Sequence, residues 1–456
     1  MKDLTTKDTK VTKEKDIRPL PEGWAWTTIG DVADTTSGGT PSRKYPEYFQ
    51  GTIPWAKSGE LGDGFISKTE EKITDDALRN SSAKLFPSGT VLVALYGATV
   101  GKVGILKIDA ASNQAVCALF PRNNSFTAKY MFYWLMSQRR ELMNKSMGGA
   151  QPNISQGIVR SHPFPLTTLP EQERIVARLE ELLSDLEAGV AALGRVRLGV
   201  KRYKASVLKA AVEGRLFEQN FNDESVNDLL ERVLGSDYQE EITPSENSKK
   251  PFVPPGWAYG KLENLIYIAG RIGWRGLKAS EYTIEGPLFL SVYNLNKGDN
   301  VNFTDIYHIS QERYDESPEI MLQENDILLA KDGAGIGKIG IVKDLPKEAT
   351  VNSSLLVIRA SKIFIPEFLF YLLKGPQMQD IARARIAGSA TPHLFQRDIK
   401  QFTLLIPPLA EQRRIVAEVD RRLESARAVE SAVEAGLKRA KRLRQAVLRS
   451  AFEGRL

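Results

Sequence analysis

The chain repeats itself, and this repeat constrains the architecture more than any other feature. The segment Leu169–Ala177 (LPEQERIVA) recurs as Leu409–Ala417 (LAEQRRIVA), about 240 residues later. Roughly 19 of the 48 residues that begin at Leu169 are identical in the second copy, down to a shared Glu-Gly-Arg-Leu end. A match of this length predicts two copies of one structural unit. The length of 456 residues also favours two domains over one.

The repeat extends upstream of this motif. Pro21–Trp24 (PEGW) corresponds to Pro254–Trp257 (PPGW), and Gly97–Ile105 corresponds to Gly333–Ile341. Each half is therefore expected to be a globular part followed by a helix. The predicted order is a disordered arm (1–17), a globular domain (20–168), a central helix (169–217), a linker (218–253), a second globular domain (254–408) and a C-terminal helix (409–456). The linker is expected to hold one short amphipathic helix near 226–234.

Both helices carry the alternating four-three spacing of a coiled-coil seam. The first seam is Ile175, Leu179, Leu182, Leu186, Gly189, Leu193, Val196, Val200, Tyr203, Val207 and Ala210. The second is Ile415, Val419, Arg422, Ala426, Val429, Val433, Gly436, Ala440, Leu443, Val447 and Ser450. Each helix would span roughly 70 Å, too long for burial in one domain. We expect antiparallel pairing with pseudo-twofold symmetry; the alternative is that each helix packs only on its own domain.

The globular parts are predicted to be α+β domains. Short β-rich runs separated by glycine loops predict hairpins at Thr90–Tyr96 with Lys102–Leu106 and at Asp326–Ala330 with Lys338–Val342. Apolar runs at Ala128–Met136 and Pro366–Leu373 predict helices. The predicted fold is thus two similar α+β domains separated by a pair of long antiparallel coiled-coil helices, with a pseudo-twofold internal repeat.

The glycine loops that end in lysine do not fit a nucleotide-binding loop. In Gly97–Lys102 and Gly333–Lys338 the outer glycines are one residue too close for a phosphate-binding loop. Val103 or Ile339 stands where such a loop needs a Ser or Thr for magnesium, and a strand follows instead of a helix. The better interpretation is a tight hairpin with a surface lysine.

Composition and motif searches exclude several classes of protein. The single cysteine, Cys117, forms no internal disulfide, and three scattered histidines assemble no zinc ligand set by spacing. No segment reads as a signal peptide or membrane span, so we expect a cytoplasmic protein without a membrane partner. No nucleophile elbow, zinc motif or amino-methyltransferase tetrad is present, so we expect no catalytic residues and no metal. An enzyme whose carboxylates are scattered in sequence remains an alternative.

Polar loops in both domains offer candidate contacts to nucleic acid. Arg and Lys bind guanine edges and phosphates, whereas Asn and Gln bind adenine edges. The candidates in the first domain are Thr40, Ser42, Arg43, Lys44, Lys57, Ser58, Tyr96, Lys102, Gln151 and Asn153. Those in the second domain are Arg271, Trp274, Arg275, Lys278, Tyr293, Asn294, Lys331, Lys338 and His393. Any one of them can be an ordinary solvated side chain, and a protein-binding coiled-coil adaptor is a further alternative. As a set, on a chain of formal charge +6, they favour nucleic acid.

Two domains that each open with Pro-x-Gly-Trp and close with Leu-x-Glu-Gln-x-Arg-Ile-Val-Ala plus a long helix resemble the DNA-specificity subunit of type I restriction-modification systems. The resemblance covers about residues 20–456. Its specific part is the segment before and at each helix start, Leu166–Gln172 and Ile406–Gln412. The weaker hallmark is Thr36–Pro41. Thr167 and Thr168 replace the usual Pro-Pro in the first copy.

The resemblance implies a non-catalytic subunit. Each globular domain would be a target recognition domain that reads one half of a split site on double-stranded DNA, while the helix pair fixes the gap. Two methyltransferase subunits and two restriction subunits would assemble on it and would hold S-adenosylmethionine, ATP and magnesium, with no cofactor in this chain. Divergent loops predict an asymmetric target. The basic helix surface (Lys438, Arg439, Lys441, Arg442, Arg444) could face DNA, the partner subunits or solvent.

Overall fold

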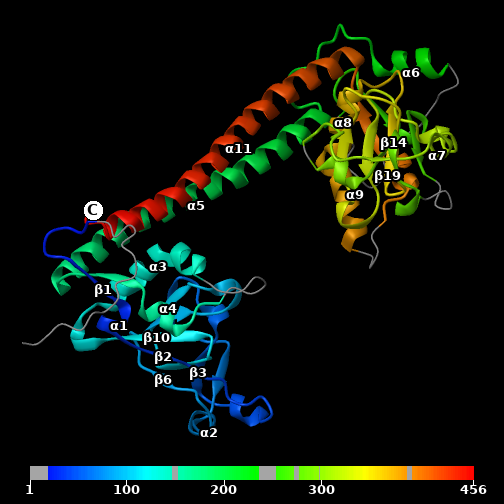
Figure 1. Cartoon of the computed structure of the whole chain (residues 1–456). Helices are drawn as coiled ribbons and strands as arrows, with labels where there is room; N and C mark the ends of the chain where they lie inside the picture. The colour runs from blue at the N-terminus through cyan, green and yellow to red at the C-terminus, as the bar shows by residue number, and fades with distance from the viewer. Residues whose placement is uncertain (1–18, 146–152, 236–252, 272–276, 297, 388–392) are drawn as a thin grey trace, which may run out of the picture. The chain divides into compact units, whose positions relative to one another are not determined.

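The computed structural model describes residues 19–145, 153–235, 253–271, 277–296, 298–387 and 393–456 (Figure 1). They form two compact units. Unit 1 comprises the chain up to Gly194 together with Glu434–Leu456, and unit 2 comprises Arg195–Val433. Each unit contains one α+β domain and one part of both long helices, α5 (Leu169–Val212) and α11 (Leu409–Ala451). The arm predicted over 1–17 lies outside the described residues.

Unit 1 contains three sheets. One is an antiparallel ribbon of β1 (Ala25–Thr28) and β11 (Pro163–Leu166). The second has the order β2 (Ala33–Ser37), β10 (Val116–Pro121), β7 (Val91–Ala94), β8 (Val103–Leu106), β4 (Gly64–Ile66). The third has the order β5 (Glu71–Ile73), β3 (Ile53–Ala56), β9 (Ala110–Ser112), β6 (Leu85–Phe86). The helices are α1 (Ile29–Val32), α2 (Asp75–Arg79), α3 (Ala128–Asn144) and α4 (Gln156–Arg160), and α3 packs on β7 and β8.

Unit 2 repeats this plan. The ribbon is β12 (Ala258–Lys261) with β20 (Thr403–Ile406). The second sheet has the order β13 (Ile266–Gly270), β19 (Leu355–Ala360), β16 (Ile327–Ala330), β17 (Ile339–Ile341), and the third the order β15 (Tyr307–His308), β14 (Thr283–Leu290), β18 (Ala349–Val351). The helices are α6 (Val226–Leu234), α7 (Gln311–Asp315), α8 (Pro366–Lys374), α9 (Pro376–Ala387) and α10 (Gln396–Lys400). A parallel pair, β3 with β9 or β14 with β18, occurs in each third sheet.

The two predicted hairpins are confirmed. Strand β7 pairs antiparallel with β8, and β16 pairs antiparallel with β17. A single turn of 3₁₀ helix connects each pair, at Gly97–Thr99 and Gly333–Gly335. Gly97 and Gly333 have φ of 70° and 68°, a conformation that favours glycine. The glycine–lysine segments are therefore tight hairpin loops.

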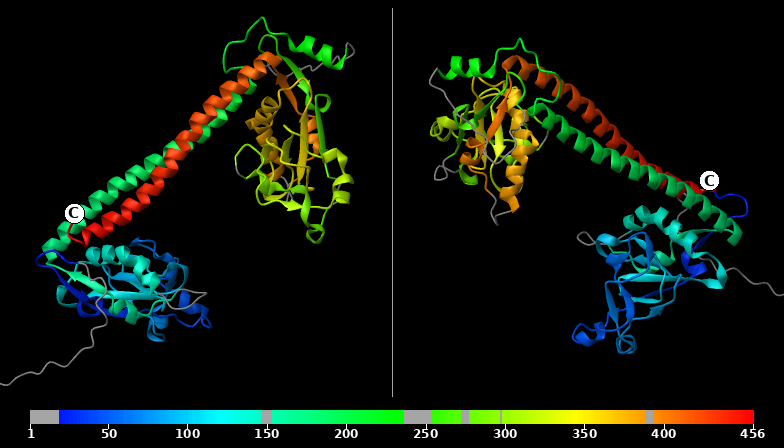
Figure 2. Two further views of the ribbon diagram at one scale, coloured as in Figure 1. Left: turned by 45° about the horizontal axis from the view of Figure 1, so that its top comes forward. Right: turned by 180° about the vertical axis from the view of Figure 1, so that it is seen from behind.

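The long helices pair antiparallel in both units, so the alternative of separate packing is wrong (Figure 2). In unit 1 Leu179 and Leu183 from the first half of α5 share a core with Leu448 from the last turns of α11. In unit 2 Val207 from the end of α5 shares a core with Val419 from the start of α11. Ion pairs cross the helix pair in each unit: Glu187 with Arg444 at 3.8 Å, and Lys204 with Glu430.

Several predicted seam positions are nevertheless exposed. Tyr203 is 43%, Val429 41% and Leu443 50% exposed. A straight helix has 3.6 residues per turn, so a strict 3.5-residue pattern drifts off the contact line. Leu183, which the heptad pattern omits, is buried in the core of unit 1.

Both helices also end five residues earlier than predicted, at Val212 and Ala451. Gly214 and Gly454 have φ of +66° and +67°, and the N–H of the following arginine bonds back to the helix: Arg215 to the Ala210 carbonyl, at 2.9 Å, in the first copy. This left-handed glycine cap terminates a helix. The shared Glu-Gly-Arg-Leu is therefore a stop signal and not the last helical turn.

The shared Glu-Gln pair anchors each helix start in its own domain. The Gln172 side chain is buried, accepts a hydrogen bond from the Thr127 N–H (2.9 Å) and donates to the carbonyls of Ser125 and Thr167 (3.0 Å each). Gln412 makes the equivalent bonds to the Ile365 N–H and to the carbonyls of Ile363 and Pro407. The glutamine thus bonds the loop that precedes α3 or α8 to the first turn of the long helix.

The glutamate of the pair reaches the repeated tryptophan in unit 2. Trp257 Nε1 donates to Glu411 Oε2 at 2.8 Å, and both side chains are buried. Burial raises the pKa of Glu411, although the hydrogen bonds from Trp257 and Gln219 oppose the rise. In unit 1 the equivalent Glu171 instead pairs with Arg174 within the helix, at 2.7 Å.

The segment predicted as a linker is partly built into unit 2. Helix α6 forms at Val226–Leu234, as predicted, and buries Val226, Leu229 and Leu230 in the core that also receives α5 and α11. Asp223 pairs with Arg414 at the start of α11. Residues up to Leu234 therefore belong to the folded unit, because their apolar stripe finds a buried partner.

Replacing Gln172 tests this anchor. In Gln172→Leu, one N–H and two carbonyls lose their buried partner, so the free energy of unfolding should fall by about 2–4 kcal/mol. Chemical unfolding of the full chain measures the loss. The neighbouring Glu173 is exposed, and Glu173→Leu should change the stability by less than about 0.5 kcal/mol. Equal effects of the two substitutions would contradict the assignment.

A second prediction concerns His162, which is fully buried in unit 1 beside Trp134. Burial, helped by Lys145, lowers the pKa of His162 to about 4. The unfolded chain therefore binds more protons between its ordinary pKa near 6.5 and pH 4, and stability falls as pH falls through this window. Between pH 7 and pH 4.5 this histidine should cost about 2–3 kcal/mol.

The measurement is urea unfolding followed by tryptophan fluorescence at the two pH values. His162→Leu should lose less stability on acidification than the unaltered chain, whereas His308→Gln, in unit 2 and only partly buried, should behave like the unaltered chain. An unchanged acid loss in His162→Leu would show that other groups cause it.

Candidate nucleic-acid interface

Backbone hydrogen bonds join several of the predicted loops into one edge of unit 1. The Leu95 N–H donates to the Ala115 carbonyl at 2.8 Å, and the Ile154 N–H donates to the Leu95 carbonyl at 2.9 Å. The Gly39 N–H donates to the Ser112 carbonyl at 2.8 Å. We call the edge formed by residues 38–40, 95–97, 112–115 and 153–155 the unit 1 rim.

Three of the predicted residues share this rim. Tyr96 and Asn153 form an antiparallel β-bridge, and both are exposed. The exposed Thr40 donates its hydroxyl to Gln114 Oε1. Lys102 follows the same hairpin loop and is half-buried. The rim thus presents phenol, carboxamide, hydroxyl and ammonium groups to solvent, the donors and acceptors that read base edges and phosphates.

Arg43 and Lys57 lie in an ion-pair cluster with Glu70 and Glu71. Arg43 pairs with Glu71 at 2.7 Å and stacks over the Phe49 ring at 3.9 Å. Lys57 pairs with Glu70 at 2.8 Å and with Glu71 at 3.1 Å, and these hydrogen bonds raise the pKa of Lys57. Burial acts to raise the pKa of Glu71, but the hydrogen bonds from Lys57 and Arg43 outweigh burial and lower this pKa. Both cations therefore have carboxylate partners within the chain, although Arg43 stays 57% exposed.

Unit 2 has an equivalent edge. The Lys331 N–H donates to the Ser354 carbonyl at 2.9 Å, and the Leu394 N–H donates to the Lys331 carbonyl at 2.8 Å. The Asn352 N–H donates to the Leu290 carbonyl at 2.8 Å. We call the edge formed by residues 290–291, 331–333, 352–354 and 393–395 the unit 2 rim.

The central pair of the rim differs between the units. Where unit 1 has Tyr96 and Asn153, unit 2 has Asp332 and His393, joined by the same antiparallel bridge and by a hydrogen bond from ring Nδ1 to the carboxylate. The His393 ring lies 4.5 Å from the Phe395 ring, and the Arg397 guanidinium lies 4.7 Å from the same ring. One scaffold thus carries two chemically different side-chain pairs at the same place.

Two predicted contacts of the second domain are core groups. Arg271 is 2% exposed, and its guanidinium donates to the Val351 carbonyl at 3.1 Å and to the Thr350 and Ser317 hydroxyls. Asn294 is 3% exposed and donates to the Asn302 carbonyl at 2.9 Å. Neither is accessible to a ligand in this structure, so we remove both from the candidate interface.

The remaining predicted residues that the structure describes lie outside the two rims. Tyr293 is 53% exposed, Lys278 is exposed, and Lys338 is exposed and donates to Asn296 Oδ1 at 2.6 Å. In unit 1 Ser42 and Lys44 are exposed and Ser58 begins a 3₁₀ turn. Gln151, Trp274 and Arg275 lie outside the described residues.

The structure adds residues to the unit 1 rim that the sequence did not single out. Gln156 Nε2 donates to the Thr35 carbonyl (2.8 Å) and hydroxyl (2.7 Å), and Lys84 Nζ donates to the Thr36 hydroxyl (2.6 Å). Gln114 is the partner of Thr40. The only signal for Gln114 was a polar Asn-Gln pair between two apolar strands, which is typical of any hairpin.

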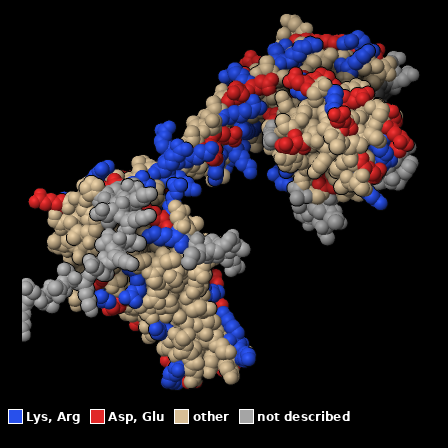
Figure 3. Space-filling model, viewed as in Figure 1, with Lys and Arg blue, Asp and Glu red and all other residues tan. Residues whose placement is uncertain are grey.

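Lys and Arg gather on the long helices (Figure 3). In the unit 1 part of α11 every charged residue between Glu434 and Glu453 is basic. Lys438, Arg439, Lys441, Arg442 and Arg449 are exposed there, whereas Arg444 pairs with Glu187. Among the described residues these five exposed side chains form no ion pair.

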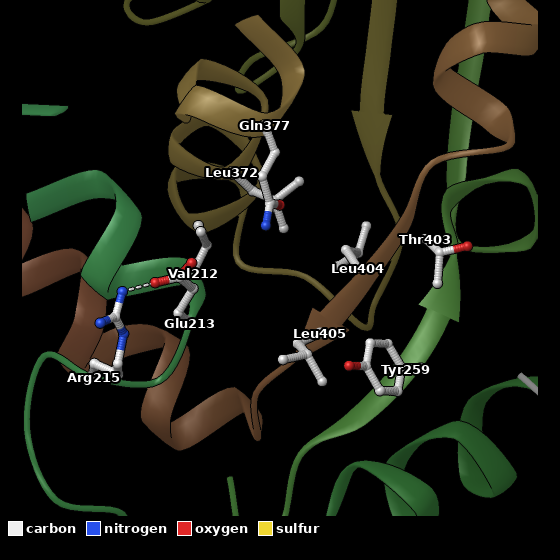
Figure 4. A pocket seen from close by; sticks show the side chains of 9 residues that line it. All are labelled: Val212, Glu213, Arg215, Tyr259, Leu372, Gln377, Thr403, Leu404 and Leu405. Atoms are coloured by element: carbon white, nitrogen blue, oxygen red, sulfur yellow. Dashed lines mark hydrogen bonds and ion pairs between the residues drawn. The ribbon is translucent and has the colours of Figure 1, made fainter. Parts of the chain in front are cut away.

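A hollow of about 450 Å³ in unit 2 lies at the end of α5 (Figure 4). Its lining is Val212, Glu213, Arg215, Tyr259, Leu372, Gln377, Thr403, Leu404 and Leu405, with Glu213 ion-paired to Arg215. In unit 1 the repeat places larger rings there: Phe452 packs on Trp134 at 5.1 Å, and Trp134 on Trp26 at 6.0 Å. The hollow therefore results from smaller side chains in the second copy.

The described residues contain no group of three or more His, Cys, Asp or Glu side chains arranged to hold a metal ion. None of their helices combines the length and the apolar character needed to cross a bilayer.

Comparison with known proteins identifies the family. The family model of the type I restriction modification DNA specificity domain matches residues 21–192 and 277–435, one region in each half of the chain. The type I restriction enzyme MjaIX specificity subunit of Methanocaldococcus jannaschii is 25% identical over 87% of this chain and 86% of its own length. The EcoBI specificity subunit of Escherichia coli is 26% identical over 76% of this chain and 69% of its own length.

Solved structures agree on the fold. A chain from a study of complex assembly and conformational transition of the type I R-M system has a TM-score of 0.68 at 21% identity and covers 96% of this chain and 100% of its own length. The HsdS subunit of Thermoanaerobacter tengcongensis has a TM-score of 0.54 at 19% identity, over 96% and 99%. The chain therefore belongs to the type I restriction-modification DNA specificity family.

Proposed function

We propose that this chain is the DNA-specificity subunit of a type I restriction-modification complex. Each α+β domain reads one half of a split target on double-stranded DNA, and the antiparallel helix pair sets the spacing. The observation that carries the proposal is the repeated rim: one backbone scaffold presents Tyr96 and Asn153 in one copy and Asp332 and His393 in the other. If the two rims carry different side chains and bind one duplex, the two half-sites differ and the target is asymmetric.

The chain supplies specificity, and its partners supply chemistry. We assign the two target recognition domains to 20–168 and 254–408, and the shared helices to the docking of two methyltransferase and two restriction subunits. Methyl transfer from S-adenosylmethionine and ATP-driven, magnesium-dependent cleavage belong to those subunits. We place the complex in the cytoplasm, where its DNA target is accessible.

The candidate contacts divide into two sets. Thr40, Tyr96, Lys102 and Asn153 in the first domain, and Lys331, Asp332, Lys338 and His393 in the second, are our candidates for contact with DNA. Gln114 joins the first set because Thr40 bonds to it, and Gln156 joins it because it lies three residues after Asn153 and bonds to Thr35 of β2. The amide groups suit adenine edges, and the lysines suit guanine edges or phosphates.

Substituting Asn153 tests this division. In Asn153→Ala the backbone bridge can remain while the carboxamide is lost, so discrimination in one half-site should weaken by about tenfold to a hundredfold per base pair and the other half-site should be unaffected. The reconstituted methyltransferase is given a DNA library randomised at both halves, and methylated positions are read by sequencing.

Glu173→Gln, at an exposed α5 position outside the rim, is the matched control and should leave both half-sites unchanged. Relaxation of both halves together, or of neither, would count against the rim assignment. A purified chain that methylates or cleaves DNA without partner subunits would instead support the enzyme alternative.

A further inference from the structure

The unit 1 part of α11 carries charge that the fold itself does not use. We define the α11 basic face as Lys438, Arg439, Lys441, Arg442 and Arg449. At 100° per residue, Lys438, Arg442 and Arg449 lie within about 40° of one another, with Arg439 and Lys441 on either side. The buried Val433 and Ala451 lie on the opposite side. The basic face is therefore turned away from the contact with α5.

These cations repel each other in the folded helix. Lys438 and Arg442 are four residues apart, and Lys438 with Lys441 and Arg439 with Arg442 are three apart, the spacings at which like charges destabilise a helix. Carboxylates lie only at the two ends of the face, Glu434 four residues before Lys438 and Glu453 four residues after Arg449, and Glu187 on α5 is paired with Arg444. A surface that opposes folding and has no partner within the described chain fits an external polyanion.

The repeat places a related surface on α5. In the unit 2 part of α5, Lys201 and Arg202 occupy the positions of Lys441 and Arg442, and both are exposed. No acidic residue occurs between Glu187 and Glu213. Lys204 and Lys209 in this stretch are paired with Glu430 and Glu213, so fewer free cations remain there than on α11.

Within unit 1 the basic face is connected to the rim loops. Gln445 lies on the same side of α11 as Lys438 and Lys441, and its Nε2 donates to the Ser137 carbonyl on α3 at 3.1 Å. Two residues further along α3, Arg139 Nε donates to the Gly101 carbonyl at 3.0 Å, in the hairpin loop between Tyr96 and Lys102. The exposed Arg140 lies next to it. A ligand bound to the rim can thus extend across α3 onto α11.

The composition of the face favours nucleic acid over protein. Five exposed cations lie close together with no acid between them, whereas the buried core of a protein interface is depleted of charged residues. From Lys438 to Arg449 the face extends about 16 Å along the helix, the length of about five phosphates on one DNA strand. Flexible point charges along this length suit a regular phosphate backbone.

We propose that the α11 basic face binds the sugar-phosphate backbone of unspecified DNA beside the half-site read by the first domain, without preference for base sequence. This inference rests on the proposed function, which puts such DNA between the two half-sites. The face would supply affinity and salt dependence, while the two rims supply sequence discrimination.

The test is a fourfold neutralisation, Lys438→Gln, Arg439→Gln, Lys441→Gln and Arg442→Gln, in the full chain assembled with its methyltransferase subunits. The slope of log affinity against log salt should fall by about 3 units, and affinity at about 0.15 M salt should fall at least tenfold. The ratio of affinities for the target and a scrambled sequence should not change. The matched control neutralises four exposed arginines that are paired with nearby carboxylates, at Arg79, Arg174, Arg178 and Arg421. It should change the slope by less than 1 unit.

A second probe locates the contact. In this probe, neutral methylphosphonates replace the phosphates of the interval, the unspecified DNA between the two half-sites. The unaltered complex should then lose as much affinity as the fourfold substitution removes. The fourfold variant should lose no further affinity. Arg439→Lys with Arg442→Lys, which keeps the charge, should retain the affinity and shows that the helix tolerates substitution.

The outcomes separate the inference from the proposed function. If the fourfold variant has the salt slope of the control, or responds to methylphosphonates like the unaltered complex, the basic face does not bind the interval. If the variant instead loses its methyltransferase subunits, the face is a protein interface and the inference is wrong. If the unaltered complex prefers no sequence, the proposed function is wrong. The salt slopes of the fourfold variant and the control on nonspecific DNA then still show whether the basic face binds the DNA backbone.

Discussion

The buried glutamine at the start of each long helix is the contact on which the join between that helix and its own domain depends. Gln172 and Gln412 each satisfy three backbone groups that would otherwise be buried without partners, and they join a long helix to the loop that precedes a domain helix. Such groups are costly to leave unpaired, so this junction has one strongly preferred geometry. The helix direction relative to its own domain is therefore fixed by a polar contact, while the seam contributes mainly apolar burial.

The repeat made the fold largely predictable. A 3.6-residue pattern and a duplicated motif are local in sequence, so the helices, the hairpins and the antiparallel pairing follow from them. The errors arose where local pattern competes with three-dimensional geometry. Leu443 fits the heptad but drifts off the contact line, and the residues after Gly214 look helical until its positive φ ends the helix. Helix α6 lies in the predicted linker, yet its apolar side chains are buried in the core of unit 2, a contact that the local sequence does not reveal.

The candidate interface was less predictable, for a physical reason. An arginine in a glycine-rich loop can face solvent or can pair with polar and acidic groups of its own domain, and composition does not distinguish these two cases. Arg271 is buried on hydroxyls and a carbonyl, and Arg43 is neutralised by Glu71. By contrast Tyr96 and Asn153 are brought together over 57 residues of sequence only by the backbone bridge. Long-range pairing of this kind determines an interface and leaves no periodic signal.

Duplication explains why specificity and stability can change independently here. The glutamine junctions, the left-handed glycine caps and the order of the strands that the two copies share are common to both, whereas the last strand of the second and third sheets, the rim pair and the hollow at the helix end differ. The side chains of the rim pair, Tyr96 with Asn153 and Asp332 with His393, are half-buried or exposed, so replacing them costs little folding free energy. Phosphate contacts need no base information, so a basic helix face can serve any pair of rims. The same scaffold can therefore carry many different targets while its affinity for the DNA backbone stays constant.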